Sequence, residues 1–210
     1  MLSTYLALTT MLASAAWAQT YAYRTDEIGR LLGLKPLYAE SGRPSSQREV
    51  RIWIGFGMIE PETLTRLHTD GTSVRGSKIY WWSRTTDPAA EAEADRDPNL
   101  ISNGELYVNL QKTAGCRGRH RRGAYEMCEA TLAPGQSWQA VLQSLDSLGI
   151  DALPNGTAMG LDGWRVVVEV RDGARYRTYS YFMPESTDTN LEVRSAAAIV
   201  ELVGRIGYRE

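Results

Sequence analysis

The chain has 210 residues, of which 43% are hydrophobic, and a formal net charge of −2 at pH 7. That hydrophobic share is ordinary for a globular core. The near-neutral charge argues against general nucleic-acid binding, which needs a strong positive field. Beyond the N-terminal segment, no stretch approaches the roughly 20 consecutive apolar residues that span a bilayer, so we expect no stable membrane span.

The N-terminal segment has the pattern of an export signal. Its apolar run, Leu6–Trp17, is too short to anchor the chain in a membrane. The run ends at Ala16-Trp17-Ala18, a small-x-small pattern that signal peptidases accept. We interpret residues 1–18 as a cleavable signal peptide, with cleavage before Gln19, and expect a periplasmic or secreted protein. A buried N-terminal helix is the alternative.

Residues 19–49 are expected to form a short helix and a linker. Thr25–Leu34 is predicted as the helix, because Thr25 suits an N-cap and two acidic residues follow it. Ala39–Glu49 is rich in turn-forming residues and is predicted as a linker or loop. A single α+β domain is expected over residues 50–210.

Three strands are predicted at the start of that domain. Val50–Met58 alternates apolar residues with others, as in a strand with one buried face. Asp70-Gly71 is a turn signal that joins Leu64–Thr69 and Thr72–Ser83 into a hairpin. The acidic segment Asp87–Pro98, bounded by prolines, is predicted as a solvated loop.

A second hairpin is predicted around Asp172-Gly173, between Gly163–Arg171 and Ala174–Met183. A two-residue turn there pairs Arg171 with Ala174. Cross-strand partners share a face, so this register defines the core face of the hairpin. Its members are Trp164, Val166, Val168, Val170, Arg175, Arg177, Tyr179 and Tyr181.

Two amphipathic helices are predicted from apolar residues at helical spacing. They are Ser137–Leu148, with Ser137 as N-cap, and Leu191–Ile206. Strands, a helix, a hairpin and a helix in this order indicate the α+β class. We expect an antiparallel sheet built from hairpins, with the two amphipathic helices packed on it.

The chain has two cysteines, Cys116 and Cys128, and an even count in an exported chain predicts a disulfide. A metal-binding pair is the alternative, but no His or Cys at ligand spacing completes a four-ligand site. We therefore expect no metal and no cofactor. Two further strands are predicted at Glu105–Thr113 and Ala124–Leu132, and the disulfide would tie the base of the loop between them.

That loop, Gly115–Gly123, carries four arginines and a histidine. Crowded guanidinium groups repel one another, which favours an anionic partner, and their planar donors match phosphate and carboxylate oxygens. A lipid headgroup, an anionic glycan or an acidic protein surface fits this chemistry. The alternative is a solvated loop tip neutralised by Asp87–Asp97 of the same chain. The candidate binding residues are Arg117, Arg119, His120, Arg121 and Arg122.

Recognisable catalytic motifs are missing from the sequence. It contains no Walker loop, HExxH, GxSxG or dinucleotide fingerprint. The aromatic cluster of Trp53 and Tyr80–Trp82 suits either a sugar-binding platform or a core. We expect an exported binding or interaction protein of the cell envelope or exterior, with an anionic partner that the sequence does not identify. A secreted hydrolase whose active site follows no motif is the alternative, and a structural envelope component is the third possibility.

Overall fold

The computed structural model describes residues 24–40, 44, 46–56, 61–83, 103–133, 135–158, 160 and 163–207. The signal peptide interpreted at residues 1–18 and the loop predicted at Asp87–Pro98 lie outside these residues. Within them, the chain forms an antiparallel sheet covered by helices, so the predicted α+β class is confirmed. No helix of the described part is long and apolar enough to cross a membrane.

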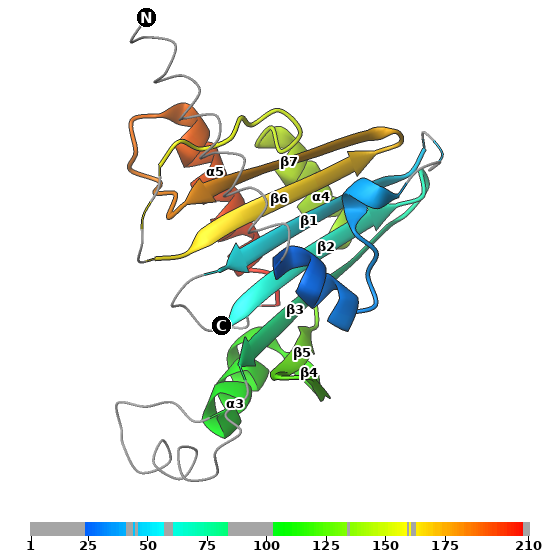
Figure 1. The fold of residues 1–210 in the computed structure, drawn as a ribbon, viewed down its shortest axis with the longest axis vertical. Coiled ribbons are helices and arrows are strands. Elements are labelled where there is room, and N and C mark those ends of the chain that lie inside the picture. Colours follow the sequence, from blue (N-terminus) through cyan, green and yellow to red (C-terminus); the bar gives the residue numbers. More distant parts are fainter. Residues whose placement is uncertain are drawn as a thin grey trace, which may run out of the picture.

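The sheet has seven strands in the order β4-β5-β3-β2-β1-β6-β7, and each neighbouring pair is antiparallel. β4 and β7 are therefore its two edges (Figure 1). The strands are β1 Arg48–Gly55, β2 Glu62–Thr69, β3 Val74–Ser83, β4 Cys116–Arg122, β5 Tyr125–Ala130, β6 Arg165–Asp172 and β7 Arg175–Phe182.

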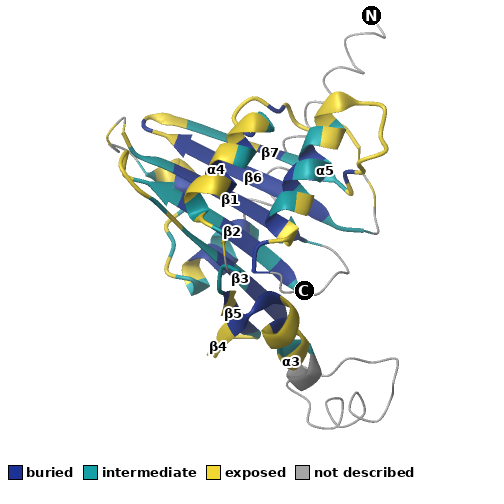
Figure 2. Ribbon diagram, turned by 180° about the vertical axis from the view of Figure 1, so that it is seen from behind, coloured by how far each residue is buried: buried dark blue, intermediate teal, exposed yellow. Residues whose placement is uncertain are grey.

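One face of the sheet is covered by α3 (Asn103–Ala114), α4 (Trp138–Ser147) and α5 (Leu191–Gly204), as Figure 2 shows. The helices α4 and α5 correspond to the two predicted amphipathic helices, and the Oγ of Ser137 caps α4 by accepting from the Ala140 N–H at 3.2 Å. The two helices contact one another, α4 also contacts β3, and both share a core with β1, β2, β6 and β7. Their shared core includes Val50, Ile52, Leu67, Val141, Leu145, Val166, Val168, Tyr179, Ile199 and Val203.

The opposite face is covered by a short helix over residues 24–31 and the 3-10 helix η1, Leu37–Ala39. Both lie in front of the sheet in Figure 1. Residue 24 is already helical, so Thr25 lies inside the helix instead of capping it. Ile28 is fully buried in a second core, together with Trp53, Leu64, Trp81, Met127 and Val167.

The aromatic cluster is a core feature. Trp53 and Trp82 are 0% exposed and Trp81 is 1% exposed. The rings of Trp53 and Trp81 meet edge to face, with centroids 6.0 Å apart. A sugar-binding platform needs an accessible ring face, so the structure contradicts that interpretation for these three residues.

The strand predicted at Glu105–Thr113 is wrong, because this segment belongs to the helix α3. Its apolar residues fit the two-residue repeat of a strand and also the repeat of about 3.6 residues of a helix. Leu106, Val108 and Leu110 alternate, but Leu106 and Leu110 are also one helical turn apart. The structure buries Leu110 in a core with Trp82 and leaves Val108 43% exposed. Helical packing over β3 and β5 therefore decides between the two patterns.

The second hairpin is present, but its predicted register is wrong. Asp172 pairs with Arg175, so the turn is Gly173-Ala174 and every pair shifts by two residues. Gly173 adopts a φ of 54°, a conformation that glycine accepts without steric cost. A shift of two residues keeps each side chain on its face, so the predicted core face is retained, with Val166 opposite Tyr181.

Candidate functional site

The five basic candidate residues lie on β4, at one edge of the sheet, and not in the loop predicted at Gly115–Gly123. β5 pairs with β3 on one side and with β4 on the other, which makes the basic segment a strand. Every residue from Arg117 to Arg122 is exposed. The five candidates therefore share one exposed strand, and the predicted loop conformation is wrong.

The predicted disulfide between Cys116 and Cys128 is present, with a Cα–Cα distance of 5.6 Å. Both cysteines are 1% exposed and belong to the core beneath α3. The bond joins the first residue of β4 to β5, so it holds the edge strand on the sheet.

A bulge divides the basic strand, because the register with β5 shifts between Arg117 and His120. Gly118 inside the bulge has a φ of 66°, and a Cβ there would lie 2.9 Å from Nε2 of His120. Glycine is therefore suited to this position. Beyond the bulge, His120 and Arg122 pair with β5 residues on the face covered by the helix of residues 24–31.

Arg119 and Arg121 turn to the other face, where both bind the carboxylate of Glu126. Nε of Arg119 donates to Glu126 at 2.8 Å, and Nε of Arg121 donates at 3.3 Å. The Arg119 guanidinium also lies 5.4 Å from the centroid of the Tyr107 ring of α3. Glu126 is 1% exposed, and a carboxylate so buried needs cationic partners. These two arginines therefore hold the hairpin together.

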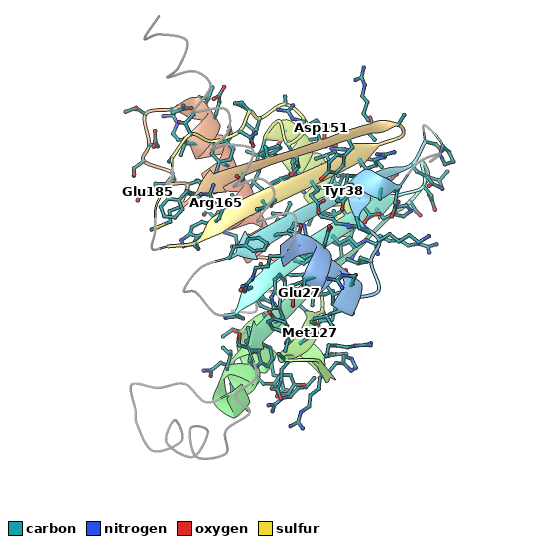
Figure 3. All side chains as sticks on the ribbon, viewed as in Figure 1. Glu27, Tyr38, Met127, Asp151, Arg165 and Glu185 are labelled. Carbon is teal, nitrogen blue, oxygen red and sulfur yellow. A yellow bond between two sulfur atoms is a disulfide. The ribbon has the colours of Figure 1, made fainter. Side chains whose placement is uncertain are left out.

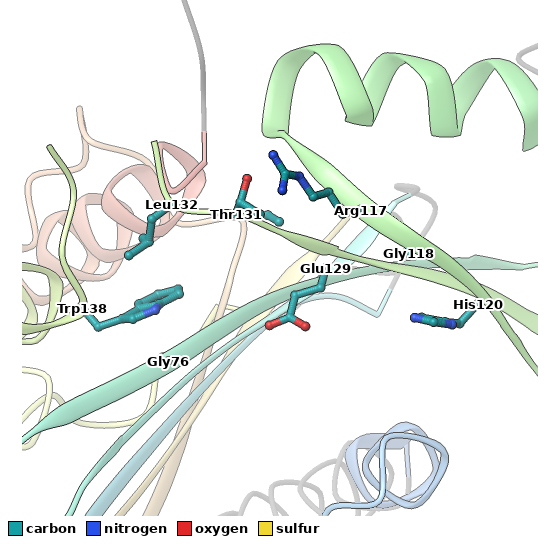
Figure 4. Close-up of a pocket in the computed structure, with 9 residues that line it drawn as sticks. Gly76, Arg117, Gly118, His120, Glu129, Thr131, Leu132 and Trp138 are labelled. Carbon is teal, nitrogen blue, oxygen red and sulfur yellow. The ribbon is translucent and has the colours of Figure 1, made fainter. Parts of the chain in front are cut away.

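Arg117 and His120 line an open pocket of about 500 Å³ with Glu129, Leu132 and Trp138 (Figure 4). The pocket lies where β5 ends and the chain turns toward α4, beside the first half of β3. It joins residues from β3, β4, β5 and α4 that are far apart in the sequence. Only Arg117 and His120 among its lining residues were candidates from the sequence.

Three of the candidate side chains on β4 have no polar partner in the described part of the chain. Within the described residues, Arg117, His120 and Arg122 have no hydrogen-bond or ion-pair partner. Arg117 is opposite Glu129 in the strand register, yet their charged ends point away from one another in Figure 4. The Glu129 carboxylate instead lies between the Trp138 ring and His120 in that view. The pocket thus offers separate donor and acceptor groups.

A buried polar network on the face covered by residues 24–40 could also have been indicated by the sequence. Glu49 is 0% exposed and accepts hydrogen bonds from Nε of Arg51 at 2.8 Å and Nε of Arg66 at 2.7 Å. Alternation of charged and apolar residues along β1 is the signal that could have indicated it. The two guanidinium groups supply the partners that the buried Glu49 carboxylate needs.

Glu169 forms the second part of this network. It accepts from Nε1 of Trp53 at 2.7 Å and from the Tyr176 hydroxyl at 3.0 Å. Burial raises the pKa of the Glu169 carboxyl. The ring of Tyr38, on η1 in front of the sheet in Figure 3, lies 6.1 Å from that of Tyr176, and the Tyr38 hydroxyl donates to Asp26. These contacts fasten residues 24–40 to the sheet.

No group of three His, Cys, Asp or Glu side chains in the described part of the chain is arranged to hold a metal ion. Comparison with known proteins gives no match: no family model, no curated protein and no solved structure is significantly similar to this chain. The fold and the site together define an α+β protein with a basic edge strand beside an open pocket.

Proposed function

We propose that this chain is an exported binding protein of the cell envelope or exterior, and that it recognises an anionic ligand at the pocket beside β4. The observation that carries this proposal is the division of the basic residues. Arg119 and Arg121 are held by Glu126, whereas Arg117 and His120 line the pocket without a polar partner among the described residues.

The chemistry of an anionic ligand supplies what the site lacks. A guanidinium group presents parallel N–H donors that match the two oxygens of a carboxylate or phosphate. Arg117 and Arg122 lie on the same exposed strand and both add to its positive potential. That potential attracts an anion, so binding is expected to weaken as salt screens the charges.

Two observations support export. The apolar run and small-x-small end of residues 1–18 have the pattern of a signal peptide. The Cys116–Cys128 bond is enclosed in a core, and disulfides persist mainly in oxidising compartments. Together they support the proposed periplasmic or secreted location.

The test is an NMR titration of the protein with citrate and with inorganic phosphate, which separates carboxylate from phosphate recognition. We expect one of these anions to shift the Nε–H signal of Arg117 and the ring signals of His120, and added NaCl to reduce the affinity. The variant Arg117→Ala, His120→Ala, Arg122→Ala lacks these reporter side chains, so its binding is followed through the backbone amide signals of β4 and β5. It should lose affinity for the anion. Arg121 is left intact because its removal would disturb Glu126.

The matched control is Arg75→Ala, Arg175→Ala, Arg194→Ala, which removes three exposed arginines elsewhere on the surface. It should bind like the unmodified protein. Equal binding by both triple variants would show that the unpaired side chains of β4 do not form an anion site.

A further inference from the structure

We propose that the anion recognised at this pocket is the carboxylate of an acidic saccharide, such as a uronic acid residue of an anionic glycan. This inference rests on the proposed function and adds the class of ligand. Three features of the pocket carry it: an aromatic ring, an acidic side chain and a cationic group, all from different elements.

Trp138 supplies a surface for a sugar ring. The indole is half-buried, packs against Gly76 on one side and borders the pocket. Leu132 lies on the same lining, so this end of the pocket is apolar. Aromatic side chains offer large apolar faces with a polar N–H at the edge, which suits a ligand that combines C–H and hydroxyl groups.

Glu129 selects against ligands that carry only negative charge. It is exposed, it lines the pocket with Arg117 and His120, and it has no polar partner among the described residues. A carboxylate accepts hydrogen bonds and donates none when ionised. It would repel a phosphate or a run of acidic residues but would bind hydroxyl groups.

An acidic sugar meets all three requirements in one rigid unit. Its ring offers a C–H face for Trp138, its hydroxyls can donate to Glu129, and its carboxylate can accept from Arg117 and His120. The pocket volume of about 500 Å³ lies within the range usual for small-ligand sites, roughly 300–1,000 Å³. An acidic peptide offers the carboxylate but fewer hydroxyl donors for Glu129.

The experiment compares four probes by calorimetry: digalacturonate, neutral galactobiose, citrate and the peptide Gly-Glu-Gly-Glu. We expect digalacturonate to bind at least about tenfold more tightly than each of the others. It should also shift the indole N–H signal of Trp138, which citrate should leave in place.

Two variants test the assigned roles. Trp138→Leu keeps an apolar side chain against β3 but removes the ring. The affinity for digalacturonate should therefore fall by about tenfold, while the affinity for citrate should change little. Glu129→Gln removes the repulsive charge from an exposed position without disturbing the fold. It should improve citrate binding and reduce the preference for digalacturonate over citrate.

Each other outcome overturns a separate statement. Equal affinity for digalacturonate and citrate would overturn the proposal that the ligand is a saccharide, and the pocket would remain a general anion site. Peptide binding as tight as that of digalacturonate would have the same consequence. Equal affinity for digalacturonate and galactobiose would show that the carboxylate is not recognised. Failure of all three anionic probes would overturn the proposed function itself.

Discussion

Gly76 of β3 and Trp138 of α4 are so close that no side chain fits between them: a Cβ added at Gly76 would lie 2.4 Å from Cδ2 of the indole. Gly76→Ala is therefore expected to displace the indole. Overpacking of this kind typically lowers the free energy of unfolding by about 1–3 kcal/mol. Urea denaturation, monitored by tryptophan fluorescence, measures the loss of stability. The emission of the folded state reports the new environment of the indole.

The control for this prediction is Gly204→Ala in α5, where an added Cβ would meet no atom within 4 Å. That substitution should be neutral or slightly stabilising, because alanine favours helix. Equal stability of both variants would contradict the tight contact at Gly76.

Loss of the disulfide should weaken the hairpin of β4 and β5. The double substitution Cys116→Ala, Cys128→Ala is expected to lower the free energy of unfolding by about 3 kcal/mol, as for a loop of similar size. A reducing agent should lower the free energy of unfolding of the unmodified protein by a similar amount. It should leave that of the double variant unchanged. If reduction has no effect on the unmodified protein, the bond does not form in solution.

Stability should depend on pH through Lys78. Its Nζ donates to the carbonyls of Val203, Gly204 and Ile206 at the end of α5, and burial lowers its pKa to about 7 from 10.5. Between these two values the unfolded chain holds a proton that the folded chain has released. The free energy of unfolding should therefore rise with pH in that window.

Lys78→Met removes this group while keeping a long side chain in the same space. The difference in stability between the unmodified protein and this variant should grow in favour of the unmodified protein from pH 7 to pH 9. Denaturation curves at several pH values measure it. A difference that is constant across this range would show that the pKa of Lys78 is the same in both states.

Glu126 and Glu129 are the two acidic residues of β5, and their substitution should affect stability differently. Glu126→Gln removes the charge that binds Arg119 and Arg121, and should lower the free energy of unfolding by about 2 kcal/mol. Glu129→Gln changes the charge equally at an exposed position and should leave stability nearly unchanged. Thermal denaturation measures the stability of both variants. An equal loss of stability in the two would contradict the role of Glu126 in binding Arg119 and Arg121.

Export makes a prediction about the mature N-terminus. If residues 1–18 are a cleaved signal peptide, the protein recovered from the periplasm or medium should begin at Gln19. N-terminal sequencing or intact-mass measurement gives the answer directly. A mature chain that retains Met1 would overturn the interpretation.

Local signals were enough to predict much of the fold. The helices α4 and α5 and both Asp-Gly hairpins follow from cap residues, turn residues and short-range periodicity. The strand predicted at Glu105–Thr113 failed because Leu106 and Leu110 satisfy two periods at once. Only the packing of Leu110 against Trp82, a long-range contact, separates helix from strand there.

The site was predictable only in part for the same reason. Crowding of arginines was visible in the sequence, so Arg117 and His120 were candidates. Their neighbours in the pocket, Gly76 and Trp138, come from distant segments, and nothing in the sequence indicated that they lie beside the arginines. The division between paired and unpaired arginines depends on the position of Glu126 across the hairpin.

Both outer strands of the sheet carry arginines, and this affects how copies of the protein meet. β4 and β7 are the only strands of the described sheet with an open side, and exposed edges tend to pair with other chains. Pairing of two copies through either edge would bring guanidinium groups together, since Arg175 and Arg177 lie on β7. The same positive charge that suits an anionic ligand therefore discourages the sheet from growing by edge-to-edge aggregation.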